Sequence, residues 1–237
     1  MTTQRDSVAR RDKADIEAAI SSAFGNKDLS SKLEGVSGYF LGRPYLDNPL
    51  GGGPDQNEKL SVSARGFDCV TFIETVLAAS QSRNMKDFVS VLKRIRYQDG
   101  QMSWTKRNHY MVGWARQNQA AGFVRDLTLG AAARKHRRHL NIVPGVKPRT
   151  VTFRSFPKRW VVQSSSIIRT GDILVFASTR KNLDAFHVGL AICGTRLLLR
   201  HASRTARTVI DEELEAFLKR HRMSGVMVLR PVCQPSA

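Results

Sequence analysis

The stretch ARGFDCVTFIETVLAAS, residues 64–80, places Cys69 directly after an aspartate and at the head of an apolar run. Five residues share one helix face at the i, i+3, i+4, i+7, i+8 spacing: Cys69, Phe72, Ile73, Val76 and Leu77. Asp68 stands at the N-cap position, where a carboxylate accepts hydrogen bonds from the free N–H groups of the first turn. The stretch therefore predicts a helix that begins at Cys69.

A cysteine at a helix start has two interpretations: it fills space in the core, or it is a nucleophile. Attack on an amide carbonyl needs a thiolate, a base and donors for the oxyanion. The helix dipole favours the thiolate, and the unpaired N–H groups of the first turn, that of Val70 among them, are the donors. On the second interpretation we expect the pKa of Cys69 to lie below the reference value of roughly 8.5.

Two of the six histidines are candidates for the base. His136, His139 and His221 lie in Lys/Arg-rich segments, whereas His187 and His201 lie in the apolar, strand-like segments AFHVGLAIC and RLLLRHAS. The residues alone leave two interpretations open, a Cys/His hydrolase or a pair of structural histidines. Catalysis would need both rings on one face of a hairpin. We therefore expect His187 to lie directly across from His201, with opposed residue numbers that sum to 388 and an odd-length loop around Gly194.

The predicted secondary structure changes from mainly helices to mainly strands near residue 145. Helical periodicity predicts helices at about 15–24, 86–96, 108–118 and 211–222, and Gly and Pro predict a loop at 39–59. β-Branched segments predict strands at 150–156, 159–163, 172–178, 186–193, 196–203 and 225–232. This order indicates an α+β fold, N-terminal helices packed on a mainly antiparallel sheet. We expect a single domain over 1–237, with a helical extension at 1–35 and a catalytic core at 36–231.

The formal net charge of +18 on 237 residues favours polyanionic partners: nucleic acid, anionic lipid or a carboxylate-rich wall polymer. No zinc pattern, RNP-like motif or helix-turn-helix supports nucleic acid. The cluster RKHRRH, residues 134–139, is expected to be a mobile basic loop. The three cysteines lack the spacing of a disulfide framework or a zinc site, and Cys193 is expected to be buried. Residues 1–20 show no apolar segment typical of a secretory signal peptide.

Five segments stand in the order found in the NlpC/P60 cell-wall hydrolase superfamily: LGRPY (41–45), GFDCVTFIETVL (66–77), TGDILVFAS (170–178), HVGLAI (187–192) and LLLRHAS (197–203). The combination of FDCVTFIE with HAS resembles the N-acetylmuramoyl-L-alanine amidase-like branch, formerly the DUF1460 family. The resemblance spans roughly residues 36–231. It implies a papain-like NlpC/P60 fold.

The resemblance also implies roles for individual residues. Cys69 matches the nucleophile, His187 the general base, and His201 the polar residue that orients its imidazole. Tyr45 matches a tyrosine beside the nucleophile that assists the oxyanion, and Asp68 matches a cap and substrate contact. Endopeptidases of the superfamily read DCSG where this chain reads DCVT, so the amidase-like branch fits better.

The function implied is a metal-independent cysteine amidase, without cofactor, that cuts the N-acetylmuramoyl–L-alanine bond of peptidoglycan in the periplasm or cell envelope. The positive charge would hold it on an anionic envelope surface, and nucleic acid is not an expected partner. Three alternatives stay open: a stem-peptide endopeptidase, an acyl-lipid hydrolase or transferase, and a non-enzymatic basic binding module. The sequence carries no prediction of the oligomeric state.

Overall fold

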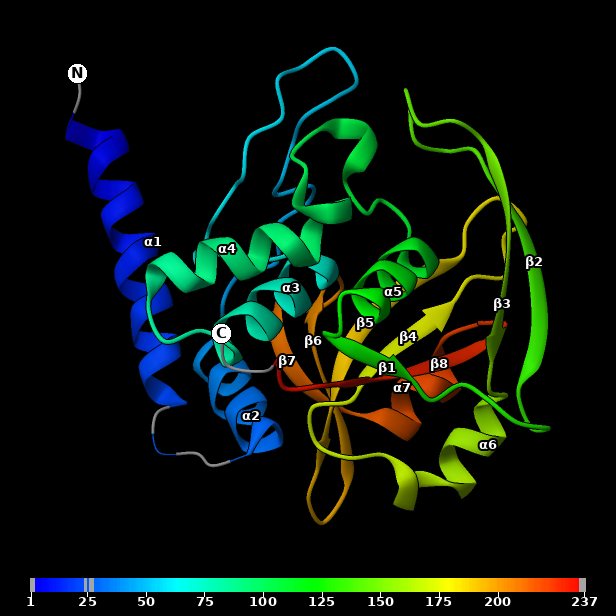
Figure 1. Cartoon of the computed structure of the whole chain (residues 1–237). Coiled ribbons are helices and arrows are strands. Elements are labelled where there is room, and N and C mark those ends of the chain that lie inside the picture. Colours follow the sequence, from blue (N-terminus) through cyan, green and yellow to red (C-terminus); the bar gives the residue numbers. More distant parts are fainter. Residues whose placement is uncertain (1–2, 24, 26–27, 235–237) are drawn as a thin grey trace.

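Helices occupy the N-terminal half of the chain and strands most of the C-terminal half (Figure 1). The computed structural model describes residues 3–23, 25 and 28–234. The first half forms α1 (Thr3–Ser22), α2 (Leu29–Tyr39), α3 (Cys69–Ser80), α4 (Met85–Arg96) and α5 (Met111–Ala120). The second half forms β1 (Val124–Asp126), β2 (Arg134–Leu140), β3 (Arg149–Ser155), α6 (Lys158–Gln163), β4 (Ile173–Ala177), β5 (Ala185–Cys193), β6 (Leu197–Ser203), β7 (Thr208–Glu213), α7 (Leu214–Arg220) and β8 (Gly225–Pro231).

Six strands form an antiparallel sheet in the order β1-β8-β4-β5-β6-β7, and β2 pairs with β3 in a separate two-stranded ribbon. The chain thus has a mixed α/β fold with a mainly antiparallel sheet. Successive side chains of β4 point to opposite faces of the sheet. Val175 joins the core under α3, and Phe176 joins the core under α6 and α7.

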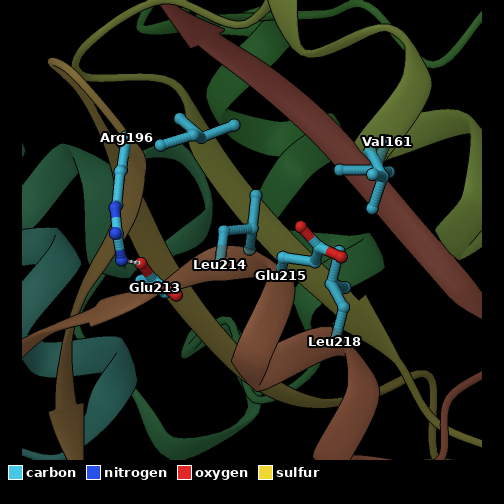
Figure 2. A pocket seen from close by; sticks show the side chains of 8 residues that line it. Val161, Arg196, Glu213, Leu214, Glu215 and Leu218 are labelled. Carbon is cyan, nitrogen blue, oxygen red and sulfur yellow. Dashed lines mark hydrogen bonds and ion pairs between the residues drawn. The ribbon is translucent and has the colours of Figure 1, made fainter.

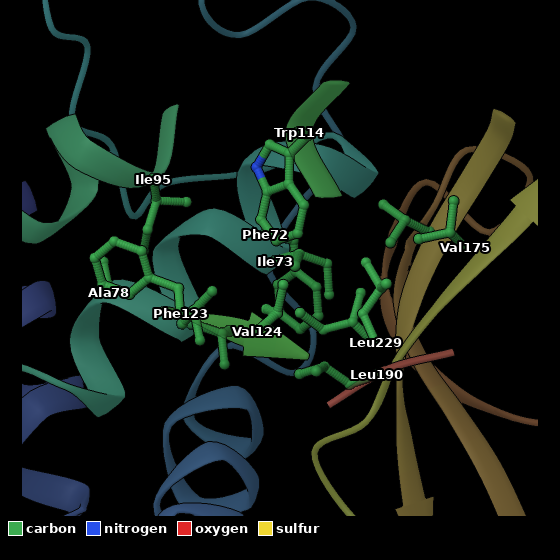
Figure 3. Close-up of a cluster of buried hydrophobic side chains, with 14 of the residues drawn as sticks. Phe72, Ile73, Ala78, Ile95, Trp114, Phe123, Val124, Val175, Leu190 and Leu229 are labelled. Atoms are coloured by element: carbon green, nitrogen blue, oxygen red, sulfur yellow. The ribbon is translucent and has the colours of Figure 1, made fainter. Parts of the chain in front are cut away.

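The helix α3 lies at the centre of the larger core (Figure 3). Phe72 and Ile73 pack there with Trp114 of α5, and Val175 and Leu229 come from the sheet. All ten residues from Thr71 to Ser80 are buried. Burial of a large apolar side chain contributes about 1.5–3 kcal/mol, so this helix is held mainly by packing.

The start of α3 agrees with the prediction. The Asp68 carboxylate accepts hydrogen bonds from the N–H groups of Val70 (3.1 Å) and Thr71 (2.7 Å). The Thr71 hydroxyl accepts a reciprocal hydrogen bond from the Asp68 N–H at 3.0 Å, which completes a capping box. Two otherwise unsatisfied donors at a half-buried helix end are therefore paired.

The helix predicted at about 15–24 is confirmed over its described part, since α1 runs to Ser22; residue 24 lies outside the described residues. Ile16, Ala19 and Ile20 of α1 are buried in the same core as α3. None of the helices formed by residues 3–23 and 28–234 is long and apolar enough to cross a membrane.

The prediction of a mobile loop at 134–139 is wrong, because these residues form most of β2. Every residue of β2 pairs with one of β3, from Arg134 opposite Ser155 to Leu140 opposite Arg149. The inward side of the ribbon buries Leu140, Val151 and Phe153. Basic residues are tolerated in this strand because Lys135, Arg137 and His139 face solvent, whereas on the inward side Arg138 donates to the Ser178 carbonyl and His136 bonds the Ser155 hydroxyl.

Three further boundaries differ from the prediction. Residues 159–163 form part of the helix α6 and not a strand. Pro157 precedes the helix, and Val161 packs into the core that α6 and α7 cover, together with Phe176. The helix predicted at 211–222 is shorter: residues 211–213 belong to β7, and α7 begins at Leu214. The helix expected at 108–118 begins at Met111. Cys193 is exposed rather than buried.

Replacement of the Asp68 cap tests this account of the start of α3. Asp68→Ala removes the acceptor and should lower the free energy of unfolding by about 1 kcal/mol. Asp68→Asn keeps a side-chain oxygen at the same place and should retain most of the stability. Urea denaturation at pH 7 measures both. An equal loss in the two variants would show that the charge, and not the cap, stabilises the helix.

Candidate active site

A cleft of about 270 Å³ opens where the N-terminus of α3 meets the first residues of β5. Asp68, Cys69 and Val70 line it from the helix, and His187 and Val188 from the strand. The structure therefore brings four predicted site residues, Asp68, Cys69, Val70 and His187, to one cleft.

The sulfur of Cys69 lies beside the open edge of β5. The pairing of β5 with β6 stops at Leu190 opposite Arg200, so the strand before residue 190 has no partner on that side. The Val188 N–H approaches the Cys69 sulfur and favours its ionised form, as do the N–H groups of Cys69 and Val70. The thiol is half-buried against the sheet.

The pKa of Cys69 contradicts the prediction of a low value. Burial raises the pKa of the thiol to about 12, and the nearby negative charge of Asp68 adds to that rise. The backbone N–H groups oppose the shift and do not cancel it. At neutral pH the Cys69 side chain is therefore a neutral thiol, and attack by its sulfur would need a base to remove the proton.

The two histidines contact each other directly. Nε2 of His187 lies 2.7 Å from Nδ1 of His201, and the two rings meet edge to face. The β5–β6 register gives a constant sum of 390, for example Cys193 opposite Leu197, with the loop 194–196 between the strands. The predicted sum of 388 is therefore wrong by two, and His187 is not directly opposite His201 in this register. An even sum still places both histidines on one face, as predicted.

Gly189 makes room for this diagonal contact. A Cβ atom at residue 189 would lie 3.0 Å from the Cβ of His201 and 2.6 Å from Cδ1 of Leu199. Only a glycine lets β5 pass this close to His201 without displacing it. Gly189 and Ala191 are thus small residues on the histidine face of β5.

The histidine face is covered by α7 and not by the Cys69 helix. Phe217 of α7 packs with its ring centroid 5.5 Å from each histidine ring. The helix α3 packs instead on the face of Val188 and Leu190. Cys69 and His187 share a cleft because both lie at the beginning of β5, next to an irregularity in its pairing with β4.

His187 is an unprotonated base at neutral pH. Burial lowers its pKa to about 3, and the neighbouring His201 and His221 lower it further because they disfavour a second positive charge. Phe176 and Phe217 lie beside the ring. Nε2 is engaged by His201, so the cleft-facing candidate for proton transfer is Nδ1. Among residues 3–23 and 28–234, no hydrogen bond joins the His187 ring to the Cys69 thiol.

Glu212, which the sequence pattern places inside a helix, lies behind His201. Its Oε2 is 3.4 Å from Nε2 of His201, and that nitrogen makes no hydrogen bond among the described residues, so Glu212 is its nearest carboxylate rather than an established hydrogen-bond partner. Arg220 forms an ion pair with the same carboxylate, and a carboxylate oxygen accepts hydrogen bonds. The sequence would have pointed to Glu212 if residues 208–213 had been predicted as a strand. Glu212 and His201 would then have been expected on neighbouring strands, as the structure places them.

The three side chains define one proton arrangement. If Glu212 accepts the proton on Nε2 of His201, Nδ1 of His201 has a lone pair and accepts the proton on Nε2 of His187. Nδ1 of His187 is then unprotonated and is the basic atom. We assign this tautomer from the hydrogen-bond network.

Two groups are placed to receive an oxyanion. The N–H groups of Val70 and Thr71 already donate to Asp68. The Val70 N–H is therefore not available as the oxyanion donor that the sequence predicted. The N–H of Cys69, at the first helical position, has no partner within the helix. Tyr45 lies close enough to Cys69 for a charge on the sulfur to raise the pKa of its phenol, after the larger effect of burial.

The far wall of the cleft contains buried ion pairs that the sequence did not reveal. Arg96 binds Glu74 at 2.6 Å, and Arg107 binds Glu58 at 2.5 Å. Because each cation is neutralised and nearly unexposed, these pairs shape the wall rather than offer free charge. His109 bonds the Trp104 carbonyl through Nε2 at 2.7 Å, which favours a structural role.

A second cavity, of about 430 Å³, lies between α6, α7 and β6 (Figure 2). It is lined by Val161, Leu214 and Leu218, with an Arg196–Glu213 ion pair at its edge. It contains none of the predicted catalytic residues. Nowhere in the described part of the chain do three or more His, Cys, Asp or Glu side chains group as a metal site would require.

The sequence matches the model of a family described as AmiA-like, N-acetylmuramoyl-L-alanine amidase-like, over residues 35–226. The chain belongs to this family. The matched region contains Tyr45, Asp68, Cys69, His187 and His201. A search of curated proteins finds no significant match.

Solved structures share the fold across nearly the whole chain. A Legionella pneumophila protein of the DUF1460 family is similar with a TM-score of 0.83 and 20% identity, over 97% of this chain and 99% of that one. A Bacteroides uniformis protein named an N-acetylmuramoyl-L-alanine amidase is similar with a TM-score of 0.70 and 25% identity, over 82% of this chain and 96% of that one. The first likeness shows the fold alone.

Thiol reactivity tests the charge environment of Cys69. In a background with Cys193→Ser and Cys233→Ser, the rate of iodoacetamide labelling should rise only at alkaline pH, because burial raises the pKa of Cys69 to about 12. Asp68→Asn removes the neighbouring negative charge and should move the midpoint to lower pH. A parent midpoint below about 8.5, the reference value, would restore the resting-thiolate hypothesis.

Glu212 can be tested by a matched pair of variants. Glu212→Leu removes the acceptor behind His201 and should lower kcat roughly 10–100-fold, the range seen when an outer partner of a functional histidine is lost. Glu212→Gln keeps an acceptor oxygen and should recover most of that loss, with KM unchanged in both. Arg220→Gln is the control for loss of the ion pair alone. Equal activity in the Leu and Gln variants would contradict the assigned tautomer.

Proposed function

We propose that this chain is a cysteine amidase of peptidoglycan with the papain-like NlpC/P60 architecture and a Cys69–His187–His201 triad. The observation that carries the proposal is the 2.7 Å bond between His187 and His201, made beside the cleft that Cys69 lines. It leaves one imidazole nitrogen as a base near a cysteine at a helix start. Membership of an amidase-like family gives that constellation its reaction class.

The proposed reaction begins with transfer of the Cys69 thiol proton to Nδ1 of His187. The sulfur attacks the lactyl carbonyl carbon of the N-acetylmuramoyl–L-alanine bond, and the Cys69 N–H and the Tyr45 hydroxyl stabilise the oxyanion. The C–N bond then breaks, and His187 gives its proton to the leaving amine of L-alanine. Water, activated by His187, hydrolyses the thioester and regenerates the thiol with release of the lactyl carboxylate.

His201 and Glu212 do not touch substrate in this scheme. The positive charge that forms on His187 is stabilised through His201 toward the Glu212 carboxylate. The low resting pKa of His187 makes this support necessary, because burial disfavours the charged ring. Asp68 acts on the same step by holding the start of α3 in place.

The bond assignment rests on family membership and on the Bacteroides uniformis neighbour that is named an N-acetylmuramoyl-L-alanine amidase. Val70 and Thr71 stand where the superfamily endopeptidases have serine and glycine. The substrate places the proposed site of action in the periplasm or cell envelope.

Mass spectrometry of muropeptides tests the proposal. Digestion of sacculi should release peptides with a free N-terminal L-alanine and glycan chains with intact lactyl groups, and EDTA should not inhibit. Cys69→Ala should abolish release, whereas Cys193→Ala, which changes an exposed thiol outside the cleft, should not. Cleavage within the stem peptide would identify an endopeptidase instead, and full activity of Cys69→Ala would refute the nucleophile.

A further inference from the structure

The positive charge of the chain is concentrated in one segment. Residues 127–171 contain no Asp or Glu and ten basic residues: Arg134, Lys135, Arg137, Arg138, Lys147, Arg149, Arg154, Lys158, Arg159 and Arg169. This segment alone supplies +10 of the formal charge of +18. Its largest ordered part is the β2–β3 ribbon, which stands on the side of the molecule away from α1 (Figure 1).

The register of the ribbon assigns each side chain to a face. The outward face carries six residues from alternate positions: Lys135, Arg137, His139, Thr150, Thr152 and Arg154. Lys135 lies directly opposite Arg154. Like charges directly opposed on a strand pair are destabilising, so the fold tolerates a local cost to keep them there. Residues two apart on one strand are about 7 Å from each other, which gives an extended row of cations.

These cations are not neutralised by the protein. None of the Lys and Arg side chains of the ribbon forms an ion pair within residues 3–23 and 28–234. Arg154 donates to the Ala133 carbonyl, a neutral group. Arginines elsewhere do find carboxylates, as Arg200 does with Asp211 and Arg230 with Asp172. The charge of the ribbon is therefore available to an external anion.

The ribbon is anchored to segments that border the active-site cleft. The His139 N–H donates to the Lys181 carbonyl at 3.0 Å, in the β4–β5 loop that continues into the cleft-lining Leu183. At the ribbon turn, the Trp104 indole donates to the Pro144 carbonyl at 2.6 Å, and Trp104 packs on the cleft-lining His109. The turn end of the ribbon therefore adjoins the rim of the cleft on a fixed support, and the cations Arg137, Lys135 and Arg154 extend along the ribbon away from that rim.

We propose that the outward face of the ribbon binds the carboxylate-bearing peptides of peptidoglycan next to the strand being cut. The proposal rests on the amidase function above, because that substrate supplies a carboxylate polymer at the cleft. A lipid bilayer fits this face less well, since none of its six residues is apolar. Single-stranded nucleic acid fits less well because the face has no Phe, Tyr or Trp side chain for stacking, Phe153 being buried on the other side.

The test uses the full chain with Cys69→Ala, so that binding is measured without cleavage. A ribbon variant carries Lys135→Gln, Arg137→Gln and Arg154→Gln. A control variant carries Arg10→Gln, Arg11→Gln and Lys86→Gln, which removes the same charge from exposed positions on α1 and α4. Unchanged thermal melting shows that each variant is folded.

Binding to purified sacculi should weaken at least tenfold in the ribbon variant and less than twofold in the control. Its dependence on NaCl concentration should also become shallower. Blocking sacculus carboxylates by carbodiimide-coupled amines should remove the difference between the proteins. With Cys69 restored, turnover of a small soluble muropeptide should stay within twofold of the parent.

An equal loss in both variants would show that net charge alone matters and would overturn the proposal. The proposal would also be overturned if the ribbon variant bound phosphatidylglycerol vesicles or duplex DNA more weakly than the parent but bound sacculi equally well. If the parent binds sacculi through the ribbon but cleaves no muropeptide, the binding surface stands and the amidase function falls. If the ribbon variant cleaves sacculi and binds them as tightly as the parent, the amidase function stands and the binding surface falls.

Discussion

The buried start of α3 is the constraint on which the site depends. A half-buried helix end packed against the sheet leaves N–H groups that need partners, and the Asp68 carboxylate satisfies those of Val70 and Thr71. The same carboxylate raises the pKa of the adjacent Cys69, which burial has already raised. Stability of the helix and ionisation of the thiol therefore oppose each other at one residue. The chain keeps the cap, so activation of the thiol falls to the histidine.

That histidine is equally constrained by its surroundings. Phe176 and Phe217 bury the His187 ring and keep it neutral, which preserves a free base but disfavours the imidazolium that catalysis must form. In the proposed mechanism His201, hydrogen-bonded to His187, and the Glu212 carboxylate 3.4 Å behind it offset this cost on the side away from the cleft. In the same proposed mechanism both reactants start neutral, and charge separation would be confined to the moment of attack, when bound substrate would exclude water.

Charge is divided between two roles in this protein. Buried or half-buried arginines such as Arg96 and Arg200 are paired with carboxylates and hold segments together. Three cations of the β2–β3 ribbon, Lys135, Arg137 and Arg154, are unpaired and exposed on its outward face. Paired charge costs desolvation and contributes mainly geometry, whereas unpaired surface charge contributes long-range attraction that salt weakens. The excess of +18 thus resides largely where a polyanion can reach it.

Local signals in the sequence determined the helix start at Cys69, the sheet-forming segments of both histidines and their common face. These features depend on neighbours within a few residues: a cap, a 3.6-residue period, and the parity of an antiparallel hairpin. Tertiary contacts decided the rest. Val161 turned a β-branched segment into α6 by filling the core over β4, and Val151 and Phe153 ordered a basic segment as β2. Register, the position of Glu212 and the pKa values of Cys69 and His187 arise from segments far apart in the chain, because burial and cross-strand distance exist only once those segments pack together.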